Sequence, residues 1–286
     1  MTKTSPGGTL TLAEDLTLSR MGYGAMQLAG PGVFGPPKDR DQAIAVLREA
    51  VRLGVTHIDT SDFYGPAVVN ELIKEALHPY PDDLRIVTKV GATRGDDASW
   101  NVALSPQDLI DAVHDNLTHL GVEALDVVNL RVGAADTAIA GSLAEPFGVL
   151  ADLRQQGLIR HLGVSGVTSE QLTEAQRIAP VVTVQNLYNL ANRQDDALVT
   201  RCADEGISYV PFFPLGGFTP LQSDVLDRVA ARLGASPQQT ALAWLLRRSP
   251  TILLIPGTSS LGHLRENVAA ADLALPEDAV AELDAI

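Results

Sequence analysis

The chain contains 286 residues, of which 45% are hydrophobic, 20% are charged and 5% are aromatic, and its formal net charge is −14. This composition allows a large aliphatic core and excludes a disordered chain, a collagen and a disulfide-stapled miniprotein. Because the sequence has no run of Lys or Arg, we expect neither nucleic acid nor an anionic membrane as a partner.

Eight short segments with β propensity recur along the chain. The first, residues 22–28, contains two glycines, which weaken a strand but let a ligand approach the backbone closely. Upstream of it, residues 9–12 and 16–18 predict a hairpin. The other seven predicted strands are richer in Val, Ile and Thr, and they comprise residues 56–60, 86–90, 127–132, 161–165, 182–186, 209–213 and 252–255.

The segments between these strands have the apolar spacing of helices, as at Leu109, Val113 and Leu117. Two of them begin with Ser-Pro, at Ser105 and Ser236, which places a capping hydroxyl and a first-turn proline ahead of the apolar positions. Strand and helix therefore alternate. Strands that are apolar almost throughout favour a parallel sheet covered on both faces.

Eight such units predict an α/β fold, a closed (β/α)8 barrel built as one domain from residues 1–286. We expect the early hairpin to cover the bottom of the barrel, its N-terminal mouth. An open doubly wound sheet is the alternative. Such a sheet normally carries a three-glycine phosphate loop after its first strand, and Gly22 and Gly24 supply only two of those glycines.

Three polar residues stand at strand ends, where the catalytic groups of a parallel barrel gather. Asp59 ends the second predicted strand, Tyr64 follows five residues later, and Lys89 lies near the end of the third. Alone, each has an ordinary explanation as a turn cap, a packing residue or a surface cation. Together they indicate a proton-transfer site. In it Asp59 keeps Lys89 charged, Lys89 lowers the pKa of Tyr64, and Tyr64 exchanges a proton with a carbonyl oxygen.

The stretch GVTHIDTSDFYG, residues 54–65, resembles the first signature of the aldo-keto reductases. Further matches follow in the order of that family at GVS (163–165), Gln185, PLG (214–216) and IPGTSS (255–260), so the resemblance covers nearly the whole chain. Within the family, segments such as TSDFYGP and VPFFPLGGF are most similar to the bacterial pyridoxal reductase branch.

The resemblance implies a catalytic tetrad of Asp59, Tyr64, Lys89 and Arg131, with NADPH extended across the barrel mouth. In relatives of this kind a serine and a glutamine hold the nicotinamide carboxamide, an aromatic ring stacks on the nicotinamide, and a late loop clamps the phosphate and adenosine. The coenzyme-binding residues implied here are Gly24, Asp59, Ser165, Gln185, Phe212, Leu215, Gly216, Gly257, Thr258, Ser260, His263 and Asn267.

Some positions depart from the family pattern. Arg131 stands where the family usually has a histidine, and a guanidinium can hydrogen-bond a developing alkoxide but cannot act as a titrating acid. A structural ion pair is the other interpretation of Arg131. Gly166 replaces an asparagine that contacts the carboxamide. Ser260 and His263 replace Lys and Arg near the 2′-phosphate, which weakens the expected preference for NADPH.

For the substrate pocket we predict Met26, Phe34, Tyr64 and Trp100, a set that suits a flat aromatic aldehyde, and we expect no metal. The predicted function is the NADPH-dependent reduction of an aldehyde or ketone to an alcohol, with pyridoxal as a candidate substrate. Two alternatives remain, namely a Schiff-base lyase with Lys89 as nucleophile and a coenzyme-binding regulatory subunit with little turnover.

The compartment is predicted from two further observations. Cys202 is the only cysteine, so no intramolecular disulfide can form, as is usual in a reducing compartment. Residues 1–20 lack the apolar segment of a signal peptide. We therefore expect a cytoplasmic protein that acts on a small molecule.

Overall fold

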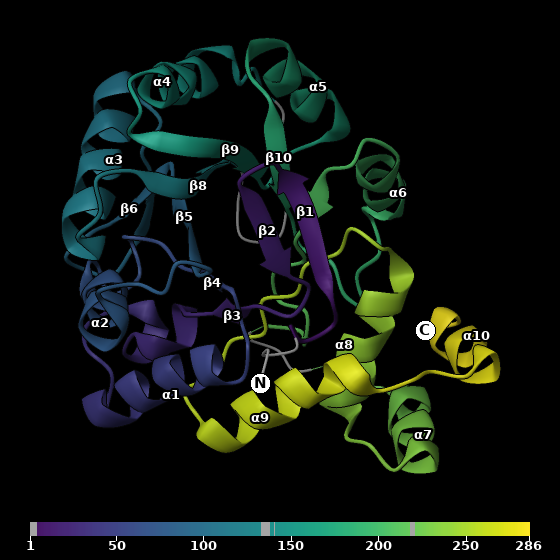
Figure 1. Cartoon of the computed structure of the whole chain (residues 1–286). Coiled ribbons are helices and arrows are strands. Elements are labelled where there is room, and N and C mark those ends of the chain that lie inside the picture. Colours follow the sequence, from purple (N-terminus) through teal and green to yellow (C-terminus); the bar gives the residue numbers. More distant parts are fainter. Residues whose placement is uncertain (1–4, 133–137, 140, 218–220) are drawn as a thin grey trace.

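The computed structural model describes residues 5–132, 138, 139, 141–217 and 221–286. Seven parallel strands form one curved sheet in the order β3-β4-β5-β8-β9-β10-β11 (Figure 1). Neighbouring strands in this order are also successive strands of the repeated βα units. Their bounds are β3 (Tyr23–Gly24), β4 (His57–Asp59), β5 (Arg85–Val90), β8 (Leu125–Arg131), β9 (Ile159–Ser165), β10 (Val181–Gln185) and β11 (Ser208–Tyr209).

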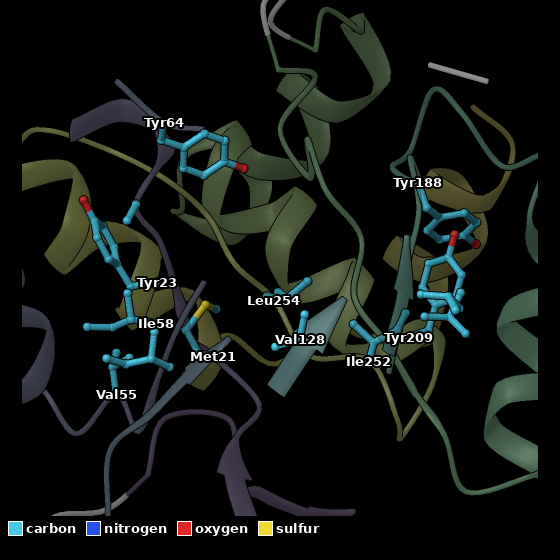
Figure 2. Packing of buried hydrophobic residues seen from close by; sticks show 14 of the residues in the cluster. Met21, Tyr23, Val55, Ile58, Tyr64, Val128, Tyr188, Tyr209, Ile252 and Leu254 are labelled. Atoms are coloured by element: carbon cyan, nitrogen blue, oxygen red, sulfur yellow. The ribbon is translucent and has the colours of Figure 1, made fainter. Parts of the chain in front are cut away.

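Residues 252–254 close this sheet into a barrel. Ile252 forms a parallel bridge with Tyr209 at one edge of the sheet, and Leu254 forms one with Met21 at the other edge. The Gly22 amide donates to the Leu254 carbonyl at 2.7 Å. Figure 2 shows Met21, Ile252 and Leu254 within the buried apolar cluster. The predicted barrel is therefore confirmed, and an open sheet does not describe the protein.

The barrel strands differ from the predicted segments mainly at the two ends of the sheet. Of residues 22–28 only β3 is extended, because Ala25 takes a helical conformation and the short 3₁₀ turn η1 (Met26–Leu28) follows. The predicted strand 209–213 shortens to β11. Residues 252–255 contribute bridges rather than a continuous strand.

Helices surround the barrel on its outer side (Figure 1). Ser105 and Ser236 accept hydrogen bonds from the third residue of their helices in complete capping boxes, as their Ser-Pro starts predict. Two further short turns are η2 (Pro31–Val33) and η3 (Ala270–Asp272). The helices are α1 (Arg40–Arg52), α2 (Val68–Leu77), α3 (Pro106–Leu120), α4 (Ala144–Gln155), α5 (Ser169–Ile178), α6 (Asp196–Asp204), α7 (Asp224–Leu233), α8 (Pro237–Arg248), α9 (Leu261–Ala269) and α10 (Glu277–Asp284).

The predicted N-terminal hairpin consists of β1 (Thr9–Ala13) and β2 (Leu16–Ser19), which pair antiparallel. Leu16 and Leu18 are almost fully buried against inward-facing residues of the barrel, among them Val87 and Val127. In Figure 1 the hairpin lies across the centre of the ring of strands. An apolar plug therefore seals the bottom of the barrel.

A second hairpin was not predicted from the sequence. It consists of β6 (Ala92–Arg94) and β7 (Trp100–Val102), directly after β5. All three residues of β7 are exposed. The segment between Ala92 and Val102 is mostly polar, and it alternates between apolar and polar residues only from Ala98 to Val102, which is too short a stretch to stand out as a strand.

Candidate active site

A cavity of about 1300 Å³ opens at the carboxyl ends of the barrel strands. Asp59, Lys89 and Gln185 stand at or near the ends of β4, β5 and β10, and all three line this cavity. Arg131, the last residue of β8, and Tyr64, in the turn after β4, line it as well. The parallel barrel thus brings together side chains that lie up to 126 positions apart in the sequence.

Asp59 and Lys89 form a buried ion pair. The Lys89 Nζ donates to Asp59 Oδ1 at 2.6 Å and to the Thr60 carbonyl at 3.0 Å. The other carboxylate oxygen, Asp59 Oδ2, accepts a hydrogen bond from Gln185 Nε2 at 2.8 Å. Because the carboxylate has a donor on each oxygen, it is held in one orientation.

Tyr64 lies beside this ion pair. The Lys89 Nζ is 5.1 Å from the centre of the Tyr64 ring, and both residues line the cavity. The structure therefore brings together the Asp59, Lys89 and Tyr64 side chains that the strand-end pattern places at one site.

The pKa of Lys89 and the pKa of Tyr64 are both raised, but for different reasons. Burial lowers the pKa of the Lys89 ammonium, but Asp59 and Tyr64 raise it by more, so Lys89 remains a cation. Burial, with a smaller contribution from the Asp59 carboxylate, raises the pKa of the Tyr64 phenol, and together they outweigh the lowering effect of Lys89 and Arg131. The net direction for Tyr64 is opposite to the sequence-based expectation, because that expectation left out burial. Tyr64 is consequently a neutral proton donor at pH 7.

Arg131 is a further charged residue in the cavity lining. Its Nη1 donates to Ser165 Oγ at 3.1 Å, and its guanidinium lies 4.9 Å from the centre of the Phe212 ring. Burial lowers the pKa of Arg131, yet an arginine stays protonated in proteins. The cavity therefore holds a second permanent cation near the phenol.

The residues expected to hold a nicotinamide carboxamide have the right chemistry for it. Gln185 and Ser165 are fully buried, and Gln185 uses its amide nitrogen on Asp59. Among the described residues Gln185 Oε1 has no hydrogen-bond partner, so it can accept from a ligand amide. Phe212 lines the same cavity. An orphaned acceptor in a cavity that an aromatic ring also lines fits a nicotinamide.

The predicted phosphate and adenosine segment begins where the barrel closes. Gly257 bridges Gly24 and lines the cavity, and a Cβ atom on Gly24 would lie 2.4 Å from the Ile255 carbonyl oxygen. Both positions therefore need glycine. Ser260 caps α9 by accepting from the His263 amide at 3.4 Å. A helix N-terminus at this end of the cavity is favourable for an anion.

The remaining predicted residues of this segment are placed as follows. Thr258 is buried, and its carbonyl accepts from the Tyr23 hydroxyl at 2.6 Å. Asn267 is buried on α9. Leu215 lines the cavity, whereas Gly216 shapes the adjoining turn with a φ of 95°.

The predicted substrate residues divide into two groups. Met26 and Trp100 line the cavity together with Tyr64. Phe34 does not belong to the described cavity lining, and its ring faces the Arg94 guanidinium at 5.3 Å. Gly32 and Val33, its neighbours at η2, line the cavity, and the assignment of Phe34 to the substrate pocket stays a prediction.

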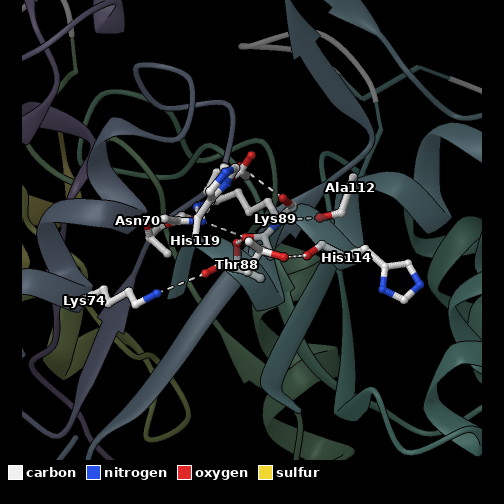
Figure 3. Close-up of polar contacts among 12 residues, drawn as sticks. Asn70, Lys74, Thr88, Lys89, Ala112, His114 and His119 are labelled. Atoms are coloured by element: carbon white, nitrogen blue, oxygen red, sulfur yellow. Dashed lines mark hydrogen bonds and ion pairs between the residues drawn. The ribbon is translucent and has the colours of Figure 1, made fainter. Parts of the chain in front are cut away.

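Sequence reasoning missed a buried polar network behind the site, which Figure 3 shows. Asn70 on α2 accepts from Thr60 Oγ1 at 2.8 Å and donates to Asp62 Oδ1 at 3.0 Å. It also donates to Asn116 Oδ1 on α3 at 3.0 Å, and both asparagines are fully buried. Thr60 is the residue whose carbonyl binds Lys89. The network therefore anchors the turn that connects Asp59 to Tyr64.

One signal could have indicated this network. Asn70 and Asn116 each stand on the buried face of an otherwise apolar helix stripe. A buried amide must find partners, so an asparagine at such a position predicts polar contacts. Its partners come from other elements, and no spacing rule identifies them.

Within the described ranges, no group of three or more His, Cys, Asp or Glu residues could hold a metal ion. A search of the same residues finds no helix long and apolar enough to cross a membrane.

A closed parallel barrel with a buried Asp-Lys pair beside a phenol at its carboxyl end defines a class of carbonyl oxidoreductases. The family model described as the aldo/keto reductase family matches residues 20–286. The chain belongs to this family.

Among curated proteins the chain is 63% identical over 272 residues to pyridoxine 4-dehydrogenase of Escherichia coli (strain K12), a match that covers 94% of this chain and 95% of the relative. Among solved structures it is similar to an aldo-keto reductase from Klebsiella pneumoniae in complex with NADPH. That similarity has a TM-score of 0.79 with 26% identity, over 100% of this chain and 95% of the other. A thermostable aldo-keto reductase in complex with the inhibitor epalrestat gives a TM-score of 0.80 with 28% identity, over 95% and 96%.

Proposed function

We propose that the protein catalyses the NADPH-dependent reduction of a small aldehyde or ketone to an alcohol, and that pyridoxal is among its substrates. The observation that carries this proposal is the Lys89 ammonium, which Asp59 fixes beside the Tyr64 phenol in the cavity. The 63% identity to pyridoxine 4-dehydrogenase supports pyridoxal as substrate. We further propose that residues 1–286 act as one catalytic domain in the cytoplasm.

The nicotinamide coenzyme, when bound, supplies a hydride to the carbonyl carbon. Tyr64 donates its phenolic proton to the carbonyl oxygen, which balances the hydride and gives the alcohol. The Lys89 ammonium stabilises the phenolate that remains. Arg131 offers N–H groups to the oxygen as negative charge develops on it. Asp59 keeps Lys89 charged and in place.

The coenzyme would be held along the cavity from the Tyr64 side to the α9 side. Gln185 and Ser165 would bind the carboxamide, and Phe212 would stack on the ring. Residues 257–267 and the loop at Leu215 and Gly216 would hold the phosphates and adenosine. The orphaned Gln185 acceptor and the helix N-terminus at Ser260 support this assignment.

The test is the substitution Tyr64→Phe. We expect kcat with pyridoxal or 4-nitrobenzaldehyde to fall by about a hundred- to ten-thousandfold, because the proton donor is lost. The affinity for NADPH, measured by fluorescence titration, should not change. Tyr80→Phe is the matched control, since the Tyr80 hydroxyl binds the Leu120 carbonyl at 2.7 Å. Full turnover by Tyr64→Phe would contradict the assignment of the acid.

The same measurements address the two alternatives. A Schiff-base lyase requires a neutral Lys89 amine, whereas Asp59 and Tyr64 hold its pKa above the ordinary value. Borohydride trapping of a substrate on Lys89 would favour the lyase. Tight NADPH binding without oxidation by any aldehyde, ketone or quinone would favour a regulatory subunit.

A further inference from the structure

Arg94, the last residue of β6, joins the two walls of the cavity mouth. Its Nη1 donates to the Val33 carbonyl at 2.6 Å, and its Nη2 donates to the carbonyls of Gly32 at 3.1 Å and Ala98 at 2.8 Å. Gly32 and Val33 line the cavity on the loop after β3. Ala98 belongs to the connection between β6 and β7. One guanidinium therefore holds together two loops that are more than sixty residues apart.

Two of these three carbonyls belong to residues with unfavourable backbone conformations. Val33 has a φ of 59° and Ala98 a φ of 63°, in the left-handed region that side-chain-bearing residues avoid. Such conformations persist only where the surroundings hold them, and they are frequent at ligand-binding sites. Arg94 provides that support for both residues.

The same guanidinium also fixes Trp100. Its Cζ atom lies 4.0 Å from the centre of the Trp100 ring, in a cation–π contact. The Phe63 ring packs against Trp100 in a T-shaped pair whose ring centres are 5.7 Å apart, and against Tyr64 in a second T-shaped pair at 5.3 Å. Trp100 lines the cavity although 51% of its surface is exposed. A large aromatic ring that is fixed at an open mouth offers a stacking surface to a ligand.

We propose that Arg94 is a specificity-determining positioning residue, which holds Trp100 as a stacking platform and thereby makes flat aromatic aldehydes preferred substrates. This inference rests on the proposed reductase function. A flat ring stacked on Trp100 would direct its aldehyde group towards Tyr64, which the Phe63 ring links to Trp100. An aliphatic aldehyde of similar size gains nothing from the platform.

The experiment compares 4-nitrobenzaldehyde with butanal in wild type, Arg94→Gln and Trp100→Leu, at saturating NADPH. For Arg94→Gln we expect KM for the aromatic aldehyde to rise by about tenfold. Its kcat, and KM for butanal, should stay within about twofold of wild type. Trp100→Leu should give the same pattern. The double variant should raise KM for the aromatic aldehyde little further, because both substitutions remove the same platform.

Arg85→Gln is the matched control. The Arg85 Nη1 also donates to two loop carbonyls, those of Asp82 and Leu84, but at the opposite end of β5. We expect it to leave both KM values unchanged. Arg94→Lys keeps the charge and loses the planar fork, and it replaces Arg94→Gln in the same comparison if thermal unfolding shows that the latter does not fold.

Equal increases in KM for both aldehydes, no increase for either, or independent effects of Arg94→Gln and Trp100→Leu would each overturn the inference. Calorimetric titration with 4-nitrobenzyl alcohol tests the platform without turnover. If the wild-type protein fails to oxidise NADPH with every aldehyde tested, the proposed function is wrong. Weaker binding of the aromatic alcohol to both variants would then still support the platform, and unchanged binding would refute it.

Discussion

The two ends of the barrel are built from the same strands but from different side chains. On β8 the inward positions change from Val127 at the bottom through Asn129 to Arg131 at the top. On β5 they change from Val87 to Lys89 within two residues. The bottom is sealed by apolar contacts with the hairpin, whereas the top contains buried charges.

This difference separates stability from chemistry along a single strand. Apolar burial at the bottom contributes favourable free energy without any need for partners. The charges at the top are costly to bury, and the ion pair is stabilised there because Lys89 and the Gln185 amide nitrogen both donate to the Asp59 carboxylate. We therefore expect substitutions at the top to affect turnover first and substitutions at the bottom to affect unfolding.

The largest expected effect is at the top. Lys89→Met removes the cation that stabilises the Tyr64 phenolate, and we expect kcat to fall by about a hundred- to ten-thousandfold in steady-state assays. Lys74→Met is the control, because the Lys74 Nζ donates to the Thr118 carbonyl at 3.4 Å in an exposed contact away from the cavity lining. Near-normal turnover of Lys89→Met would remove Lys89 from the mechanism.

At the bottom, Leu18→Ala opens the apolar plug. We expect it to lower the free energy of unfolding by about 2–5 kcal/mol in urea titrations, because a fully buried leucine is truncated. Turnover per folded molecule should stay within about twofold. Thr17→Ala on the exposed side of β2 is the control. A loss of turnover without a loss of stability would contradict the division between the two ends.

His57, the first residue of β4, should make stability depend on pH. Burial lowers its pKa to about 4, below the ordinary value of 6.5. The unfolded chain therefore binds a proton that the folded protein does not, and stability is lost as the pH falls from about 6.5 to 4. The slope from this group is at most about 1.4 kcal/mol per pH unit. His57→Gln should remove that part of the slope in unfolding titrations at several pH values, and an unchanged slope would refute it.

The sequence predicted the barrel because its strands, helix caps and early hairpin carry local signals, as at Ser105 and Ser236. It also predicted that Asp59 and Lys89 meet, since parallel strands end at one face. Contacts that depend on tertiary placement were not predictable. Arg94, for example, connects two loops whose sequences contain no pattern that would predict the contact.

Two further results show the same limit. The pKa of Tyr64 depends on burial, which depends on how closely the turn after β4 packs. The segment 252–255 has a strong apolar pattern, yet it forms only isolated bridges with its neighbours, and its sequence does not show how far the ladder extends.

Strand pairing in the barrel is least extensive where Leu254 pairs with Met21 and Ile252 pairs with Tyr209, because these contacts are single bridges and not long ladders. Three residues beyond Leu254, Gly257 bridges Gly24 and also lines the cavity. A ligand in the cavity would therefore contact the same residues that close the barrel. Ligand binding and barrel closure are linked through these residues, so a bound ligand stabilises the closed barrel against unfolding.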